Sequence, residues 1–174
     1  SRPINLHLQS LRKMGVVIEE NETGFCAETS RLRGTVLKLP FVSVGVTENA
    51  ILAAVLAEGE TVIKPAAREP EIQALCEFLQ RAGAKIDGIG SNCLVIHGVN
   101  RLHAVRYRVP ADRIVAGTYL SACMCTGGRI FLRDAPAHHM ESVLNCAVEM
   151  GAAIEYETDG ILINGRDHEA TCHM

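Results

Sequence analysis

Tryptophan is absent from this sequence, and aromatic residues make up only 4% of its 174 residues. A core must therefore be built mainly from aliphatic side chains, which the 48% hydrophobic content supplies amply. A strong excess of one charge is also missing, because the formal net charge is only −3. The composition thus gives no argument for nucleic acid or an anionic membrane as a partner. The longest apolar run, residues 50–57, is far shorter than the roughly 20 residues that a membrane span needs.

A signal peptide is not visible at the N-terminus, and the cysteines do not form a disulfide framework. Their number, seven, is odd, and Cys76 and Cys146 fall on apolar helical stripes where a thiol behaves as a small hydrophobic group. We therefore expect a reducing, cytoplasmic setting. Cys123 and Cys125 lack a second pair at zinc spacing, which favours core positions over a metal site. A solvated helix start and a chain tail are likewise favoured over a metal site for the other candidates, His138, His139, His168, Cys172 and His173.

What the sequence does contain is a repeat with a period of 68 residues. Gly15, Gly83 and Gly151 carry this spacing, and each follows an apolar stripe of helical period. Each glycine stands where a left-handed helix end is least costly, because it has no Cβ. An isoleucine follows three residues later, and a turn residue after nine residues leads into a strand. The register holds over both intervals, and it predicts three copies of one structural unit.

The central copy predicts the complete order β-α-β-α-β-β, and the third copy matches this plan. Its expected strands cover 35–39, 61–64, 84–86 and 94–96, and its helices begin at about residues 47 and 70. In the third copy we expect a strand at 107–109, a helix at 111–125 and a strand at 129–132. The first copy lacks its front half, and a fourth would begin near residue 165. The fold class is therefore α/β (α+β), and we infer that the chain is a piece of a longer protein.

The first helix of each full copy, 50–57 and 114–125, is apolar on nearly every side. A helix without a polar face has to be buried all round. The second helix of each copy has a polar face and can cover the outside of its domain. We expect the first helices to lie centrally, within a ring of sheets formed by several units.

Three stretches could carry chemistry. Residues 43–45, Ser-Val-Gly, open a buried helix, where free N–H groups and the helix dipole suit a phosphate or diphosphate. An ordinary helix cap explains this motif as well, and it is the favoured interpretation of the motif alone. In the stretch 2–7, Arg2 could hold an anion and Asn5 could bind the edge of a base, although a solvated helix start also fits. The stretch 66–72 is largely explained by helix-start chemistry.

Taken together, these stretches resemble one enzyme family, the UDP-N-acetylglucosamine enolpyruvyl transferases (1-carboxyvinyltransferases). The resemblance extends from residue 1 to about 165. The shikimate-pathway relatives share the fold but lack two of the runs, at 42–45 and 66–71. The matching runs are Arg-Pro-Ile-Asn-Leu-His (2–7), Val-Ser-Val-Gly-Val-Thr-Glu-Asn (42–49), Leu-Ala-Glu-Gly-Glu-Thr-Val-Ile (56–63), Ala-Ala-Arg-Glu-Pro-Glu-Ile (66–72), Asp-Arg-Ile (112–114) and Gly-Thr (117–118).

The resemblance implies an inside-out α/β barrel of two domains, each with three β-α-β-α-β-β units, joined by a hinge near 109–112. Residues 1–109 would be the later part of the UDP-sugar-side domain, comprising half a repeat and one full repeat. Residues 110–174 would begin the second domain. The implied reaction transfers enolpyruvyl from phosphoenolpyruvate to the 3′-hydroxyl of UDP-N-acetylglucosamine in the cytoplasm, without metal or cofactor. It is the first committed step of peptidoglycan synthesis, and so serves cell wall biogenesis, cell shape and cell division.

The resemblance also implies which residues contact the substrates. Two departures from the family pattern stand out, because Asn5 replaces a frequent Asp, and Phe41 replaces a frequent Lys that would add an ionic contact. Arg2 matches an arginine that handles phosphoenolpyruvate and its phosphate, a catalytic role. The residues matching the uridine site are Arg2, Pro3, Ile4, Asn5 and Leu6, and those matching the second uridine-diphosphate stretch are Phe41, Val42, Ser43 and Val44.

The remaining catalytic groups of the family have no match within this sequence. They are a reactive loop cysteine, a Lys-Asn pair, a general-base aspartate and a further arginine. We therefore expect this chain alone to be inactive. Apolar faces meant for neighbouring units would be exposed in such a piece, which favours self-association. The alternatives are a non-catalytic repeat domain that binds a nucleotide sugar or a protein, and a shikimate-pathway relative.

Overall fold

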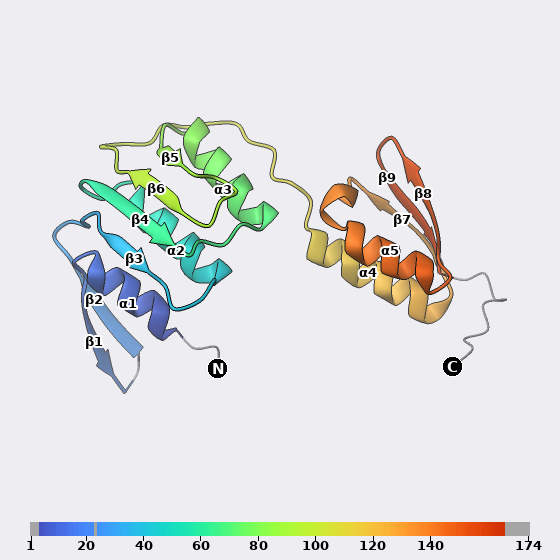
Figure 1. Ribbon diagram of the computed structural model, residues 1–174, viewed down its shortest axis with the longest axis horizontal. Coiled ribbons are helices and arrows are strands. Elements are labelled where there is room, and N and C mark those ends of the chain that lie inside the picture. Colours follow the sequence, from blue (N-terminus) through green and yellow to red (C-terminus); the bar gives the residue numbers. More distant parts are fainter. Residues whose placement is uncertain (1–3, 23, 166–174) are drawn as a thin grey trace. The chain divides into compact units, whose positions relative to one another are not determined.

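The computed structural model describes residues 4–22 and 24–165, and it divides into two compact units, Ser1–Arg108 and Val109–Met174 (Figure 1). Each unit has a hydrophobic core of its own. The first unit comprises α1 (Asn5–Lys13), β1 (Val17–Asn21), β2 (Gly24–Glu28), β3 (Val36–Lys38), α2 (Val44–Ala54), β4 (Glu60–Lys64), α3 (Pro70–Arg81), β5 (Lys85–Asp87) and β6 (Leu94–His97). The second comprises α4 (Arg113–Thr126), β7 (Arg129–Arg133), the 3-10 turn η1 (Ala137–His139), α5 (Glu141–Glu149), β8 (Ala153–Glu157) and β9 (Gly160–Asn164).

The central repeat has the predicted order β-α-β-α-β-β, running from β3 to β6. Its four strands form one sheet in the order β3-β4-β6-β5, in which β3 and β4 are parallel and the other pairs are antiparallel. The side chains of Leu37, Ile63 and Ile96 are buried on one face of this sheet, in the same core as those of α2 and α3. The alternation of buried and exposed residues along β4 follows from the two-residue period of a strand.

The glycine repeat is confirmed by identical helix ends. Gly15, Gly83 and Gly151 have φ values of 95°, 102° and 96°, and each lies two residues beyond α1, α3 or α5. At each end the glycine N–H donates to the carbonyl three residues back, and the next N–H donates to the carbonyl five residues back. This pair of bonds is the Schellman motif, which requires a left-handed residue at the glycine position. The three copies therefore end their second helix in the same way.

The predicted strand at 107–109 is wrong, because residues 98–112 form neither strand nor helix. In the central repeat the corresponding strand, β3, pairs with β4. Among the described residues of the second unit, β7 pairs with β9 alone, in a sheet of order β7-β9-β8. The physical reason lies in Tyr107, whose ring packs against Phe78 and lies under Arg81, both on α3. The segment is thus held on the first unit by side-chain contacts that its local pattern does not reveal.

The prediction that both first helices are buried all round holds for most of α2 but is wrong for α4. The two helices share a buried face, which is Thr47, Ile51 and Ala54 in α2 and Ala116, Leu120 and Cys123 in α4. Next to this face, Val46 and Ala50 are buried in α2. The residues of α4 at the same distances from the N-cap, Val115 and Tyr119, are 49% and 56% exposed. The difference arises because α1 packs on α2, and no helix in the described part of the second unit packs on α4 in that way.

The cysteine predictions are partly confirmed. Cys76 and Cys123 are buried, as expected of core thiols. Cys125 and Cys146 are exposed, so the core interpretation is wrong for them. Cys125 lies two residues after Cys123 on α4, a spacing that places it away from the buried face of the helix.

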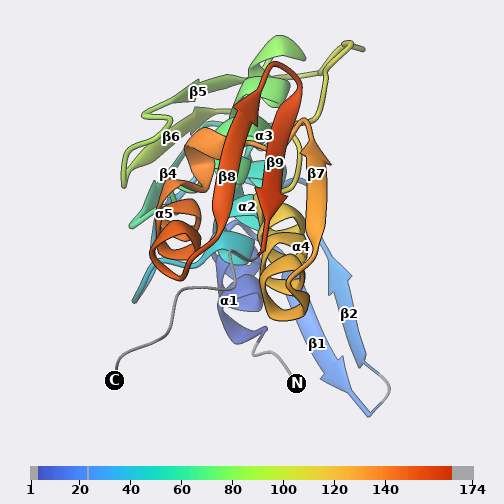
Figure 2. The ribbon, with the colours of Figure 1, turned by 90° about the vertical axis from the view of Figure 1, so that its right-hand side faces the viewer.

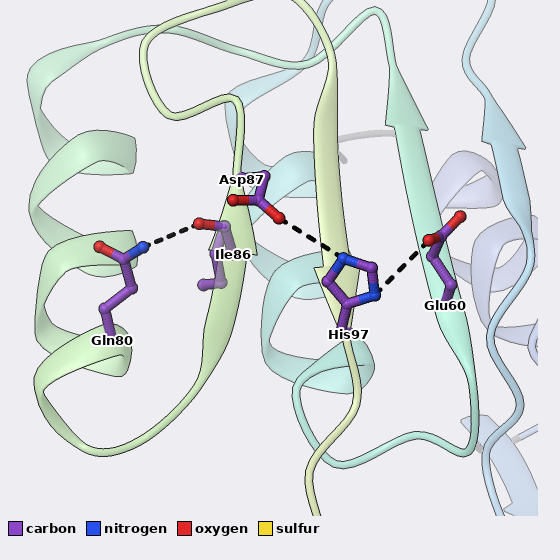
Figure 3. A network of polar contacts seen from close by, with 5 residues as sticks. All are labelled: Glu60, Gln80, Ile86, Asp87 and His97. Carbon is purple, nitrogen blue, oxygen red and sulfur yellow. Dashed lines mark hydrogen bonds and ion pairs between the residues drawn. The ribbon is translucent and has the colours of Figure 1, made fainter.

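A row of polar contacts crosses the outer face of the four-stranded sheet (Figure 3). His97 on β6 lies between two carboxylates, with Nδ1 3.5 Å from Glu60 Oε2 on β4 and Nε2 3.4 Å from Asp87 Oδ2 on β5. Gln80 Nε2 donates to the carbonyl of Ile86 at 2.8 Å and so connects α3 to β5. All three residues of this row are substantially exposed, so each contact stabilises the sheet by less than about 1 kcal/mol.

Two buried threonines allow a matched test of hydrogen bonding in the core. Thr61 and Thr47 are both 0% exposed, but Thr61 Oγ1 has no hydrogen-bond partner, whereas Thr47 Oγ1 donates to Ser43 O and accepts from Ala67 N. We expect Thr61→Val to stabilise the first unit by about 1 kcal/mol and Thr47→Val to destabilise it by about 2 kcal/mol. Urea denaturation followed by circular dichroism measures both. A loss of stability in Thr61→Val would show that its hydroxyl is satisfied.

The Cys76 thiol should resist alkylation. Burial raises its pKa from the ordinary 9.0 to about 11, and the negative charge of Glu77 adds to the rise. At pH 8 we expect iodoacetamide to modify the exposed Cys26 and Cys125 at least tenfold faster than Cys76, because the thiolate is the nucleophile. Peptide mass spectrometry measures the rates.

The same shift also predicts how stability depends on pH. The unfolded chain loses the Cys76 proton near pH 9 and the folded chain only near pH 11, so Cys76 lowers the free energy of unfolding progressively between these values. Cys76→Ala should reduce this fall. If iodoacetamide modified Cys76 and Cys26 at equal rates in the folded chain, the buried position of Cys76 would be contradicted. Unfolding in guanidinium should make the two alkylation rates equal.

Candidate functional site

The first predicted stretch lies at the start of α1. Arg2 and Pro3 lie outside the described residues. Ile4 occupies the N-cap position of α1 and is 44% exposed, and Asn5 is the first, exposed residue of the helix. Leu6 is half-buried and packs against the core of the first unit. The stretch therefore presents Asn5 to solvent while Leu6 anchors the helix.

The second stretch lies at the start of α2. Phe41 and Val42 are exposed, at 60% and 51%. Ser43 takes the N-cap position with an extended backbone, at φ −140° and ψ 119°, but its side chain makes no capping hydrogen bond. An ordinary serine cap is therefore not what the structure shows. The first-turn N–H groups of α2 remain available to another acceptor, at the positive end of the helix dipole.

The start of α4 differs from that of α2 in this respect. Asp112 holds the equivalent N-cap position, and its Oδ1 accepts from Ile114 N at 2.7 Å and from Val115 N at 3.1 Å. The carboxylate satisfies two first-turn donors and adds a negative charge. This cap disfavours an anion at the start of α4, whereas neither the N-cap nor the first turn of α2 carries an acidic residue.

Helix α1 packs on α2 (Figure 2), and this brings the described parts of the first two stretches together. The imidazole of His7 lies against Gly45, because a Cβ placed on Gly45 would be 3.5 Å from His7 Cε1 and 3.7 Å from Nε2. Residues 4–7 and 43–45 thus lie side by side, although about 40 residues separate them in sequence. His7 was not among the predicted site residues, and the available signal was its place at the end of the 2–7 run.

The third stretch, 66–72, contacts the first turn of α2. Ala66 and Ala67 are buried, and Ala67 N donates to Thr47 Oγ1 at 3.1 Å in the first turn of α2. Pro70 occupies the first turn of α3, as the helix-start interpretation predicts. The Thr47 hydroxyl also donates to Ser43 O at 2.7 Å. The backbone at Ser43 is therefore fixed by a residue that is itself held by the third stretch.

The described residues offer neither a cluster of metal ligands nor a membrane-crossing helix. Within residues 4–22 and 24–165, no group of three or more His, Cys, Asp or Glu residues is arranged to hold a metal ion. His138 and His139 lie in η1 with their ring centroids 3.8 Å apart, and the other predicted members, His168, Cys172 and His173, lie outside the described residues. None of the helices formed by the described part of the chain has the length and apolar character needed to cross a membrane.

Solved structures identify the class to which this arrangement belongs. The enolpyruvyl transferase NikO from Streptomyces tendae superposes with a TM-score of 0.79 at 21% identity, covering 94% of this chain and 42% of that chain. An EPSP synthase from Acinetobacter baumannii gives a TM-score of 0.67 at 25% identity, covering 94% of this chain and 40% of that one. The first likeness establishes the fold, that of the enolpyruvyl transferases, and confirms the expected fold class.

The family follows from the sequence. The family model described as EPSP synthase (3-phosphoshikimate 1-carboxyvinyltransferase) matches residues 1–174, so this chain belongs to that family. The chain is 50% identical over 166 residues to the UDP-N-acetylglucosamine 1-carboxyvinyltransferase of Zymomonas mobilis, and 48% identical over 165 residues to that of Chlorobium luteolum. These alignments cover 94% and 93% of this chain but 39% of each relative. The chain thus spans about two fifths of the length of these relatives, and the resemblance found in its motifs is confirmed.

Proposed function

We propose that this chain is part of an enzyme that transfers the enolpyruvyl group of phosphoenolpyruvate to the 3′-hydroxyl of UDP-N-acetylglucosamine. The observation that carries the proposal is the junction of α1 and α2, where the start of α1 lies beside an uncapped helix N-terminus. Two relatives with nearly half of the aligned residues identical bear the name of this activity. In that role the enzyme would act in the cytoplasm, in peptidoglycan synthesis.

Each side chain of the junction has a role suited to its chemistry. Asn5, exposed at the first position of α1, can donate to and accept from the edge of uracil. The free N–H groups that follow Ser43 and the Ser43 hydroxyl would bind the diphosphate. His7 can add a hydrogen bond or, when protonated, a charge at the same place. Ile4, Leu6, Val42 and Val44 would form the apolar walls, and Pro3 and Arg2, outside the described residues, would extend the site.

The domain assignment is a proposal as well. We assign residues 1–109 to the later part of the UDP-sugar-side domain and 110–174 to the first repeat of the second domain. The division of the chain into units at Arg108 and Val109 supports a boundary at this place. The exposed apolar face of α4 supports packing against further repeats, and in the isolated chain the same face favours self-association.

Phosphate release tests the proposed reaction. We expect the protein encoded by the complete gene to release phosphate from phosphoenolpyruvate with UDP-N-acetylglucosamine and not with shikimate 3-phosphate. The isolated 174-residue chain should release none above background, because it lacks the remaining acid, base and loop groups. Phosphate release with shikimate 3-phosphate and not with UDP-N-acetylglucosamine would refute the proposed acceptor substrate. Turnover by the isolated chain would refute the claim that it lacks essential catalytic groups. UDP-sugar binding without turnover by the complete protein would favour a non-catalytic binding domain.

Phe41 offers a test of the diphosphate side of the site. Its ring is 60% exposed at a position where a lysine would place an ammonium near the free helix N-terminus. We expect Phe41→Lys in the complete protein to lower the KM for UDP-N-acetylglucosamine by about three- to tenfold at low salt, with kcat nearly unchanged, because the new charge binds substrate and transition state alike. Phe25→Lys, on an exposed aromatic of β2, is the matched control. An equal decrease in KM for both variants would show that the added positive charge acts through the net charge of the protein and not at the start of α2.

A further inference from the structure

The three-stranded sheet of the second unit, β7-β9-β8, packs one of its faces on the core of that unit. Ile161 and Ile163 on β9 are 1% and 0% exposed, and Ile130 on β7 and Ile154 on β8 pack against the same core. Side chains alternate along a strand, so the residues between these isoleucines point to the opposite side of the sheet. We call that side the outer face. It comprises the odd-numbered residues of β7 and β8 and the even-numbered residues of β9, which lies between them (Figure 2).

The charges of the outer face are sorted by strand. β7 contributes Arg129 and Arg133, β8 contributes Glu155 and Glu157, and all four residues are exposed. β9 contributes no charged residue to this face. None of the four side chains forms an ion pair with another residue that the structure describes. The outer face therefore carries a column of positive charge along one strand and a column of negative charge along another.

The middle of the outer face is apolar. Phe131 on β7 lies opposite Leu162 on β9, and both are only half-buried. Gly160, the neighbouring outer-face residue of β9, has no side chain, and it separates Arg133 from Glu157 in the same cross-strand row. Neighbouring strands are about 4.8 Å apart, so the backbones of these two charged residues are roughly 10 Å apart. An apolar centre with a charged rim is the composition that protein–protein interfaces favour.

The four-stranded sheet of the first unit is not sorted in this way. On its face away from the core, β4 carries both Glu60 and Lys64, and β5 carries both Lys85 and Asp87. His97 on β6 lies between two of these carboxylates. Both signs of charge occur within single strands there, so no strand presents a column of one sign. The sorting by strand is thus a property of the second sheet and not a general consequence of the repeat.

We propose that the outer face binds the same face of a second copy of this protein, about a twofold axis parallel to β9. Such an axis exchanges the two sides of the sheet, so that β7 of each copy lies over β8 of the other. Arg133 then faces Glu157 of the second copy, Arg129 lies one row from Glu155 of the second copy, and Leu162 meets its own counterpart. A twofold axis across the strands would instead place arginines over arginines, which charge repulsion disfavours.

The size of the outer face sets the strength of this contact. Three strands of five residues span roughly 14 by 17 Å, whereas a standard interface buries about 800 Å² on each partner. We therefore expect a weak dimer, with a dissociation constant in the micromolar range, that forms less readily at high salt because its charges lie at an exposed rim. The contact is separate from the exposed apolar face of α4, and it does not depend on the proposed reaction.

Reversal of the two charged columns in the complete protein tests the proposal, with sedimentation velocity at micromolar concentrations as the measurement. Arg129→Glu with Arg133→Glu makes both columns negative, and Glu155→Arg with Glu157→Arg makes both positive. Each double variant alone should dimerise at least about tenfold more weakly than the unmodified protein, because like charges then face each other. An equal mixture of the two variants should recover the dimer, because every facing pair is again of opposite sign.

A matched control and the mixture separate this contact from general charge and from misfolding. Lys38→Glu with Lys64→Glu makes the same change in net charge on the outward side of the first sheet, and it should leave dimerisation unchanged. A monomeric unmodified protein at these concentrations would overturn the proposal. So would a mixture that stays monomeric although circular dichroism shows both variants to be folded. Undiminished dimerisation of either variant alone would also overturn it, because the copies would then meet through another surface.

Discussion

Helix α2 is apolar on nearly every side, and the sheet of its own repeat covers only part of that surface. Part of the remainder is covered by α1, the second helix of the preceding repeat, and part by α3, whereas Leu52 stays 54% exposed. Burial of apolar surface contributes about 25 cal/mol per Å², so a helix of this composition is stable in water only when a neighbouring repeat supplies a second wall. The need to enclose α2 explains why consecutive repeats pack together, and it places the start of α1 beside the start of α2.

The candidate site is a product of that packing. The 2–7 and 43–45 stretches come from different repeats, and each alone is well explained as a helix start. The starts of α2 and α4, the first helices of the two full repeats, differ in their N-caps. Asp112 satisfies two N–H groups of α4, whereas the side chain of Ser43 satisfies none in α2. An open helix N-terminus with a glycine in its first turn, facing an imidazole, is an arrangement that an anion can complete.

Much of the fold could be predicted from the sequence because its determinants are local. The left-handed glycines, the apolar stripes and the order of elements in the central repeat depend on residues within a few positions of each other, and all three are confirmed. The strand at 107–109 could not be excluded in this way, since the contacts of Tyr107 are with a helix about 30 residues earlier. The exposure of Tyr119 and Cys125 was missed for a related reason, because burial of an apolar helix depends on which neighbours are present. His7 was missed because only the tertiary packing places it against Gly45.

The two N-caps also show how copies of one structural unit can diverge. In α4 the carboxylate of the N-cap residue Asp112 accepts from two first-turn N–H groups, which fixes the local backbone and makes these two donors unavailable to a ligand. In α2 the same turn is fixed by Thr47, whose hydroxyl donates to Ser43 O and accepts from Ala67 N outside the helix, so that the Ser43 side chain is not needed as a cap. The first turn of α2 is thereby left open to a ligand while the start of α4 is closed by its own cap, although the backbone is extended at both N-cap positions.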